Sequence, residues 1–150
     1  MTYDLIVLGG GPAGYLAAQR AANAGMSTLL AEKRFIGGVC LNEGCIPTKA
    51  MLYSAKMYDN AVQGGKYGVT VGNAVLDHKT VVKRKDKIVK TLTAGIRASL
   101  KKGNVTVVEG FGKIMGRNAG GYEAEAGGEL FTGKRLLIAT GSMPVIPQIA

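Results

Sequence analysis

Cysteine, histidine, tryptophan and acidic residues are all scarce in this 150-residue sequence. It has two cysteines, one histidine and no tryptophan, and 10 acidic residues against 19 lysines and arginines. Two thiols and the distant His78 fall short of the four side chains that a structural zinc site needs, so we expect no metal site. No apolar run is long enough to cross a bilayer, so we expect no membrane partner.

The shortage of acids gives a formal charge of +9, which raises the question of nucleic-acid binding. The densest basic stretch, residues 83–90, coincides with apolar residues at every fourth position, namely Ile88, Leu92, Ile96 and Leu100. This spacing predicts a helix with one apolar face and its lysines largely on the solvated face. Few aromatic residues accompany the lysines, so we predict a solvated surface and no nucleic-acid partner.

The sequence begins MTYDLIVLGGG, with an acid at Asp4 and no basic leader. We therefore expect no secretory signal and a cytoplasmic location. The length fits one domain, so residues 1–150 are predicted to form a single domain. Cytoplasmic thiols are kept reduced, which favours catalysis or metal binding over a structural disulfide for two cysteines as close as Cys40 and Cys45.

The first part of the chain has the pattern of a βαβ unit. Residues 3–8 form a β-type run typical of a strand buried in a parallel sheet, and residues 26–31 form a second one. Between them a helix is predicted from Pro12 to Ala24, because proline suits a first helical turn and Gly25 follows the end. We therefore predict an α/β fold, a Rossmann-like domain with a central parallel sheet.

Gly9, Gly11 and Gly14 form a GxGxxG motif between the predicted strand and helix. In this context the first glycine permits a tight turn, the second admits a diphosphate close to the backbone, and the third lets the helix pack on the strand. The helix N-terminus around Ala13 offers N–H groups to phosphates. Glu32 follows the second strand, where it can accept hydrogen bonds from a ribose diol. The motif predicts a dinucleotide site but does not separate NAD from FAD.

The remainder of the chain adds helices and a second kind of sheet. Helices are predicted over residues 48–63 and from about residue 80 to residue 102. Between residues 105 and 139, β-prone runs such as VTVVEG, GYEAEA and ELFTG alternate with glycine turns, which predicts an antiparallel meander. The run RLLIATG predicts one more buried strand.

Both cysteines lie in the segment GGVCLNEGCIPTK, residues 37–49. On an ideal helix, residues five apart have Cα atoms roughly 8 to 9 Å apart, whereas a disulfide needs less than about 7 Å. Cys40 and Cys45 can close only if the helix is distorted or begins after Cys40, and Pro47 favours such an interruption. Ordinary buried cysteines remain an alternative to a redox pair, for which a helix start would lower the thiol pKa.

Three segments in order, GGGPAG, GGVCLNEGCIPTK and LLIATGSMP, resemble the flavin-dependent pyridine nucleotide disulfide oxidoreductases over the whole chain. Within that family, LNEGCIPTKAML is most similar to the dihydrolipoamide dehydrogenases. Glutathione and mercuric reductases share the glycine loop and the spaced cysteines, and stay an alternative. A non-catalytic module that binds FAD or ADP is a third interpretation.

The resemblance implies that FAD is bound, with its diphosphate at the glycine loop and its ribose at Glu32. It implies that Cys40 exchanges with a dihydrolipoyl thiol while Cys45 passes electrons to the flavin, and that NAD⁺ finally takes the hydride. Glu43 stands where many relatives carry an apolar residue. The expected cofactor-binding residues are Gly9, Gly11, Pro12, Ala13, Gly14, Glu32, Lys33, Gly38, Val39, Cys40, Cys45, Lys49, Gly112, Thr140 and Gly141.

The resemblance also implies partners. These are a dihydrolipoyl-bearing protein of a 2-oxoacid dehydrogenase or glycine cleavage complex, and a second subunit in a homodimer. Family members are roughly three times as long and continue into NAD-binding and dimerisation domains. We therefore expect this chain to be the N-terminal FAD-binding segment, without turnover by itself.

Overall fold

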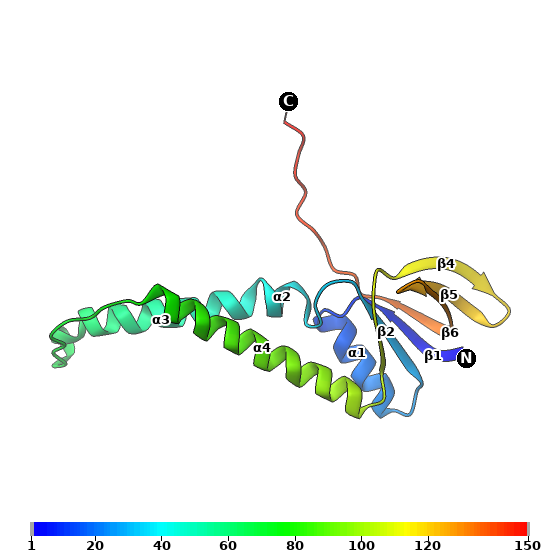
Figure 1. The fold of residues 1–150 in the computed structure, drawn as a ribbon, viewed down its shortest axis with the longest axis horizontal. Helices are drawn as coiled ribbons and strands as arrows, with labels where there is room; N and C mark the ends of the chain where they lie inside the picture. Colours follow the sequence, from blue (N-terminus) through cyan, green and yellow to red (C-terminus); the bar gives the residue numbers. More distant parts are fainter. Residues whose placement is uncertain (1, 150) are drawn as a thin grey trace. The chain divides into compact units, whose positions relative to one another are not determined.

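The structure is a computed structural model that describes residues 2–149. Contacts divide the chain into two compact units (Figure 1). Met1–Gly38 with Ile96–Ala150 form the first, which we call the sheet unit, and Val39–Gly95 form the second, the helical unit. The single domain expected over residues 1–150 stays a prediction.

The sheet unit is built on a six-stranded sheet in the order β3-β2-β1-β6-β5-β4 (Figure 1). The first four strands in this order run parallel, and β6, β5 and β4 are antiparallel neighbours. The parallel core with a small antiparallel meander confirms the predicted fold class. The strands are β1 Thr2–Leu8, β2 Thr28–Glu32, β3 Thr106–Glu109, β4 Lys113–Asn118, β5 Gly121–Ala126 and β6 Glu129–Ile138.

Two details of the predicted meander are wrong. The run VTVVEG forms β3, which pairs in parallel with β2, because the helices between these strands make a crossover connection. The runs ELFTG and RLLIATG, expected as separate strands, belong largely to the single strand β6, which passes through Gly133 without a break. A Cβ at Gly133 would lie 2.7 Å from Ile6 Cγ1, so the glycine lets β6 pack closely against β1.

Side chains of β1 alternate between two hydrophobic clusters. Ile6 and Leu8 pack on the side of β5, and Val7 packs on the side of helix α1 (Pro12–Asn23). Helix α4 (His78–Lys102) contributes residues 96–102 to this unit, and only its Leu100 is fully buried. The apolar face predicted for α4 is therefore buried at its C-terminal end. The second cluster comprises Val7, Ala18, Leu30, Ile36, Leu100 and Val105.

Asp4 ties β1 to β6 and to the start of β2. One oxygen of its carboxylate accepts a hydrogen bond from Lys134 Nζ at 2.7 Å, and the other accepts from the N–H and the hydroxyl of Ser27 at 3.0 and 2.9 Å. The bonds from Lys134 and Ser27 hold the pKa of Asp4 well below its usual range. Ionised Asp4 therefore favours the folded state.

We expect this carboxylate to make folding sensitive to acid. Because the pKa of Asp4 is lower in the folded chain, its stabilisation is complete above the unfolded pKa near 4 and is lost as the pH falls below that value. Asp4→Asn should lower the urea midpoint at pH 7 and make it less dependent on pH between about 5 and 3. Asp59→Asn, at an exposed position on helix α3 (Cys45–Val62), is the control. If the urea midpoint depends on pH equally in the native chain and in Asp4→Asn, the prediction is wrong.

The helical unit is formed by α3 (Cys45–Val62), the short helix η1 (Gly64–Tyr67) and residues 78–95 of α4, preceded by most of α2 (Gly38–Asn42). Arg84 of α4 donates a hydrogen bond to the carbonyl oxygen of Ala50 at 2.9 Å and lies over the Tyr53 ring at 5.5 Å. Helix α3 begins three residues before its predicted start at Thr48, at Cys45 itself.

Helix α4 starts at an acidic cap. The N–H and the hydroxyl of Thr80 both donate to the carboxylate of Asp77, which lowers the pKa of Asp77. His78 is the first residue of the helix and is exposed. Within residues 2–149, no helix is both long enough and apolar enough to cross a membrane.

Candidate functional site

The glycine loop follows β1, and two of its glycines are required by close packing. Gly9 has φ +103°, and a Cβ there would lie 2.2 Å from the carbonyl oxygen of Ala139. A Cβ on Gly14 would lie 1.8 Å from the carbonyl oxygen of Gly9, so only glycine lets α1 approach the loop. A Cβ on Gly11 would meet nothing closer than the Cα of Gly38 at 3.9 Å. Space beside Gly11 is therefore open to a ligand.

The N-terminus of α1 presents backbone donors beside this space. Gly11 caps the helix, and its carbonyl oxygen accepts the first helical bond, from Tyr15 N–H at 2.9 Å. No side chain in the described part of the chain caps this end. Pro12 occupies the first turn without an N–H, so the N–H groups of Ala13 and Gly14 are the donors there. Such a helix end suits an anion.

Glu32, at the end of β2, is held against the loop. Its Oε2 accepts a hydrogen bond from Gly10 N–H and its Oε1 accepts one from Arg34 N–H, each at 2.7 Å. Each carboxylate oxygen has a second lone pair, so both can accept further bonds from a ribose diol. Sequence reasoning identified Glu32 but missed the backbone donors Gly10 and Arg34. The extra glycine in the middle of the GGG run, which the GxGxxG motif does not require, was a signal for Gly10.

Three further chain segments carrying predicted residues border the loop or β2. Gly37 N–H donates to the carbonyl oxygen of Gly10 at 2.8 Å, which places Gly38 beside the loop. Gly110 N–H donates to the carbonyl oxygen of Glu32 at 3.0 Å, and Lys33 Nζ lies 5.5 Å from the centre of the Phe111 ring, next to Gly112.

The third segment follows β6. Ala139 N–H donates to the carbonyl oxygen of Leu8 at 2.8 Å, so Thr140 and Gly141 leave the sheet beside Gly9. The loops after β1, β2, β3 and β6 thus all lie at the carboxyl ends of parallel strands. The chain passes to opposite sides of β1, with β2 on one side and β6 on the other. This is the switch point at which open α/β sheets bind ligands.

The cysteines lie where one helix ends and the next begins. Cys40 is in α2, α3 starts at Cys45, and Gly44 between them has φ −124° and ψ −110°, outside the helical range. The predicted interruption of the helix is therefore confirmed. Both cysteines are free thiols in the structure, with Cys40 half-buried and Cys45 exposed.

The two thiols interact. A hydrogen bond with the Cys45 side chain, together with partial burial, raises the pKa of the Cys40 thiol above its ordinary value, while the Cys45 N–H and the Lys49 ammonium act in the opposite direction. The net shift of the Cys40 pKa is upward, because the Cys45 side chain and burial are its largest causes. Of the predicted residues, the helical unit brings together Val39, Cys40, Cys45 and Lys49.

A glycine loop with its acid at a switch point, and a dithiol at a broken helix, are the features of a nucleotide-dependent disulfide oxidoreductase. The sequence matches the family model of pyridine nucleotide-disulphide oxidoreductases over residues 3–150, and the chain belongs to this family.

Several similar relatives within the family are dihydrolipoyl dehydrogenases. The dihydrolipoyl dehydrogenase of Acholeplasma laidlawii is 45% identical over 148 residues, which cover 98% of this chain and 43% of the relative. That of Mycoplasma genitalium is 42% identical over 145 residues, covering 96% of this chain and 31% of the relative. The chain thus spans less than half the length of these relatives, as their N-terminal segment.

One solved structure supports the fold assignment. It is a Cu(II) complex of the HOCl-induced flavoprotein disulfide reductase RclA from Escherichia coli, with a TM-score of 0.77 and 25% sequence identity. The match covers 97% of this chain and 29% of that one. The mixed sheet and its flanking helices are therefore a fold that a flavoprotein disulfide reductase also has.

Proposed function

We propose that this chain supplies the FAD-binding segment and the redox disulfide of a dihydrolipoyl dehydrogenase, which oxidises dihydrolipoyl groups and reduces NAD⁺. The observation that carries the proposal is the interrupted helix, in which Cys40 lies in α2, Cys45 begins α3, and Gly44 between them is not helical. The names of the relatives at 42–45% identity support the dihydrolipoyl substrate.

The glycine loop fits FAD by its own geometry. The open space at Gly11 and the N–H groups of Ala13 and Gly14 suit a diphosphate, and Glu32 suits the adenosine ribose. Lys33 and Gly112 would border the adenosine, and Gly38, Val39 and Lys49 would lie along the cofactor. When bound, FAD would accept an electron pair from the dithiol and deliver it as hydride to NAD⁺.

Thiol–disulfide exchange accounts for the part played by the cysteines. A dihydrolipoyl thiolate attacks Sγ of Cys40 in the Cys40–Cys45 disulfide, the bond between the two cysteines breaks, and Cys45 leaves as a thiolate. The second dihydrolipoyl thiol loses its proton and attacks the mixed disulfide, which releases a lipoyl disulfide and the Cys40 thiolate. The substrate is oxidised by two electrons and the cysteine pair is reduced by two. The Cys45 N–H and Lys49 favour the Cys40 thiolate.

The partners follow from this chemistry. The substrate arm belongs to a dihydrolipoyl-bearing protein of a 2-oxoacid dehydrogenase or glycine cleavage complex, and the whole enzyme is a cytoplasmic homodimer. Turnover also needs an NAD⁺ site, which the family resemblance implies in a domain that follows residue 150. We therefore expect residues 1–150 alone to show no lipoamide-dependent NADH formation.

The proposal is tested by retention of flavin. After incubation with FAD and gel filtration, the native chain should keep the visible flavin spectrum, whereas Gly11→Ala should keep much less because its methyl group occupies the space for the diphosphate. Gly11→Ala should fold normally, since its Cβ makes only an ordinary contact at 3.9 Å. Equal retention by both chains, or by neither, would contradict the proposal.

Another disulfide reductase of the same family is the second candidate, supported by the fold shared with a flavoprotein disulfide reductase. Exchange of the reduced chain with lipoamide and with glutathione disulfide separates the candidates. Preferential oxidation by lipoamide supports the first. A chain that binds FAD but whose cysteines exchange with neither of them would be a non-catalytic module.

A further inference from the structure

The strand β3 is an edge of the sheet, because β2 is its only neighbour among the strands of residues 2–149. Gly110 N–H points toward β2, where it bonds to the carbonyl oxygen of Glu32. Successive N–H groups of a strand point to alternate sides, so the N–H groups of Val107 and Glu109 point to the free side. An edge of this kind can pair with an added strand.

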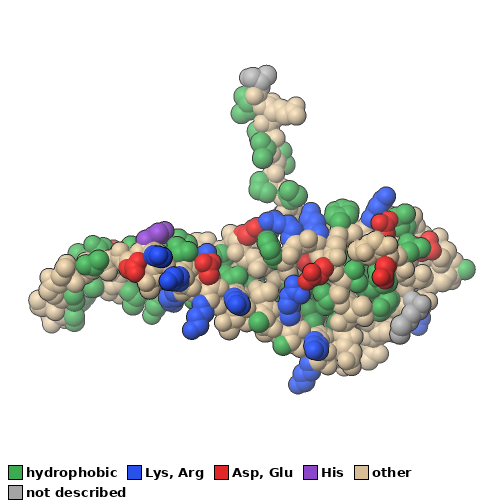
Figure 2. Space-filling view, viewed as in Figure 1, with side chains coloured by type: hydrophobic (Ala, Val, Ile, Leu, Met, Phe, Trp, Pro, Cys, Tyr) green, Lys and Arg blue, Asp and Glu red, His purple; other side chains and the backbone are tan. Residues whose placement is uncertain are grey.

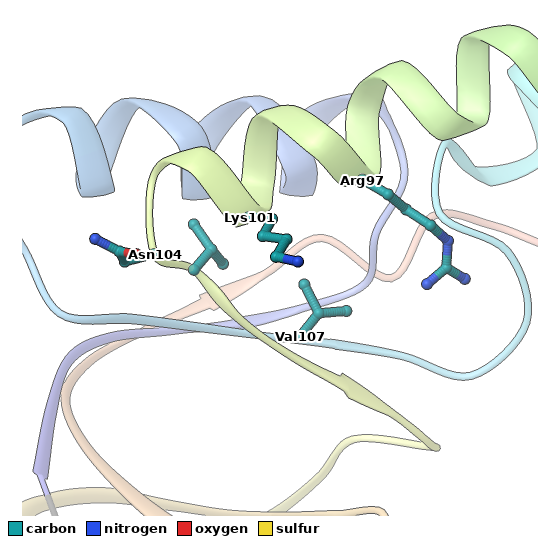
Figure 3. Close-up of a pocket in the computed structure, with 5 residues that line it drawn as sticks. Arg97, Lys101, Asn104 and Val107 are labelled. Carbon is teal, nitrogen blue, oxygen red and sulfur yellow. The ribbon is translucent and has the colours of Figure 1, made fainter.

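A hollow lies beside this edge. Arg97, Lys101, Asn104, Val105 and Val107 line a space of about 440 Å³, all within the sheet unit (Figure 3). Val105 is buried and Val107 is half-buried, so the floor of the hollow is apolar. Arg97 and Lys101 are one helical turn apart on α4 and form its basic wall.

Lys101 is the cation best placed to bind a partner. The guanidinium of Arg97 is paired with Glu109 of β3, with 3.0 Å between Nη2 and Oε1. None of the ion pairs described for residues 2–149 involves Lys101, and its side chain is exposed. On the face drawn in Figure 2, basic side chains are scattered and interspersed with acidic ones. Because charges of both signs are mixed on this face, the net charge selects no particular partner. Pairing between Lys101 and an acidic group of a partner would be more specific.

We propose that β3 and the hollow form a docking site for an extended acidic peptide segment of another protein, which adds a strand to the free edge of β3. Main-chain bonds would form at Val107 and Glu109, and alternate side chains of the peptide would point into the hollow. There a carboxylate would meet Lys101 and an aliphatic group would cover Val105 and Val107. None of the residues that line the hollow belongs to the glycine loop or to the cysteine segment.

The test uses the peptide EVEVE and the native chain labelled with ¹⁵N. Addition of the peptide should shift the amide signals of Val107 and Glu109 in a saturable way. Lys101→Glu should weaken binding by about fivefold or more, as expected for loss of an exposed ion pair and its replacement by repulsion. Lys102→Glu is the matched control, with the same charge change one position away and outside the lining of the hollow.

Two further probes separate strand addition from simple charge attraction. A peptide N-methylated at alternate residues lacks the donors for main-chain pairing and should bind much more weakly than EVEVE. Oligothymidylate, an anion of another class, should not shift the Val107 signal. The proposal is overturned by absent binding, by equal loss in Lys101→Glu and Lys102→Glu, by unchanged binding of the methylated peptide, or by a Val107 shift with oligothymidylate.

Discussion

Gly14→Ala should lower the free energy of unfolding by about 3 kcal/mol or more, at the upper end of the cost of overpacking. A Cβ at Gly14 would lie 1.8 Å from the carbonyl oxygen of Gly9, and that oxygen is backbone, so it cannot rotate away. Either α1 must move off the sheet or the loop must open. Since a domain is stable by only about 5–15 kcal/mol, the urea midpoint should fall clearly.

The matched control is Gly95→Ala, the same substitution in the middle of α4. Nothing lies within 4 Å of a Cβ there, and alanine is favoured over glycine in a helix by about 0.5–1 kcal/mol. The two substitutions should therefore shift the urea midpoint in opposite directions. A Gly14→Ala chain as stable as the native one would show that α1 does not pack closely against the loop.

The glycine loop could be predicted from sequence because the GxGxxG spacing between a strand and a helix is a local pattern. The packing of Gly9 against Ala139, far along the chain, was visible only in the fold. The hydrogen bonds that hold Glu32 could not be predicted either, because the donors at Gly10 and Arg34 are backbone groups. Any non-proline residue carries such an N–H, and its direction depends on tertiary packing. Sequence showed the acid, and only the fold showed its orientation.

The strands after residue 105 show a second limit of prediction from sequence. The residue pattern predicted β-strands there correctly. Which strand each one pairs with, and in which direction, depends on the segment of chain that connects the two strands. Strand β3 follows the crossover helices and so runs parallel to β2, while β5 follows a tight turn and runs antiparallel to β4. Two runs expected as separate strands join in β6, and Gly133 between them lets β6 pack closely against Ile6.

Helix α3 shows that a correct helix prediction leaves packing undetermined. Its start and course were close to expectation, but only Pro47 and Ala50 are buried, and Leu52 and Val62 are each about 60% exposed. The sequence predicted the helix but not which of its side chains would be covered. The broken helix at the cysteines was predictable because Pro47 cannot donate a helical hydrogen bond and Gly44 allows a non-helical backbone.

The second prediction of large effect concerns the cysteine pair. The native chain should have no reactive thiol after oxidation and two after reduction, whereas Cys45→Ala should keep one under both conditions and lose all two-electron exchange with lipoamide. Thiol titration before and after reductant measures this directly. Cys40→Ala should give the same count. Two thiols in the native chain under both conditions would exclude a redox disulfide.

The Cys45→Ala substitution should also make the Cys40 thiol more reactive. In the dithiol, the Cys45 side chain is the largest cause of the raised pKa of Cys40, and alanine removes it while keeping the backbone N–H. The pKa of Cys40 should therefore fall in Cys45→Ala, which increases the thiolate fraction and the alkylation rate by iodoacetamide near pH 7.

Adding Lys49→Gln to Cys45→Ala should raise the pKa of Cys40 again, because the ammonium of Lys49 favours the thiolate. Adding Lys56→Gln, a lysine of the same helix that is not among the groups acting on Cys40, should not. The pH profile of alkylation distinguishes these chains by its midpoint. If both lysine substitutions move the midpoint equally, overall charge rather than the position of Lys49 tunes the exchange thiol, and the proposed role of Lys49 fails.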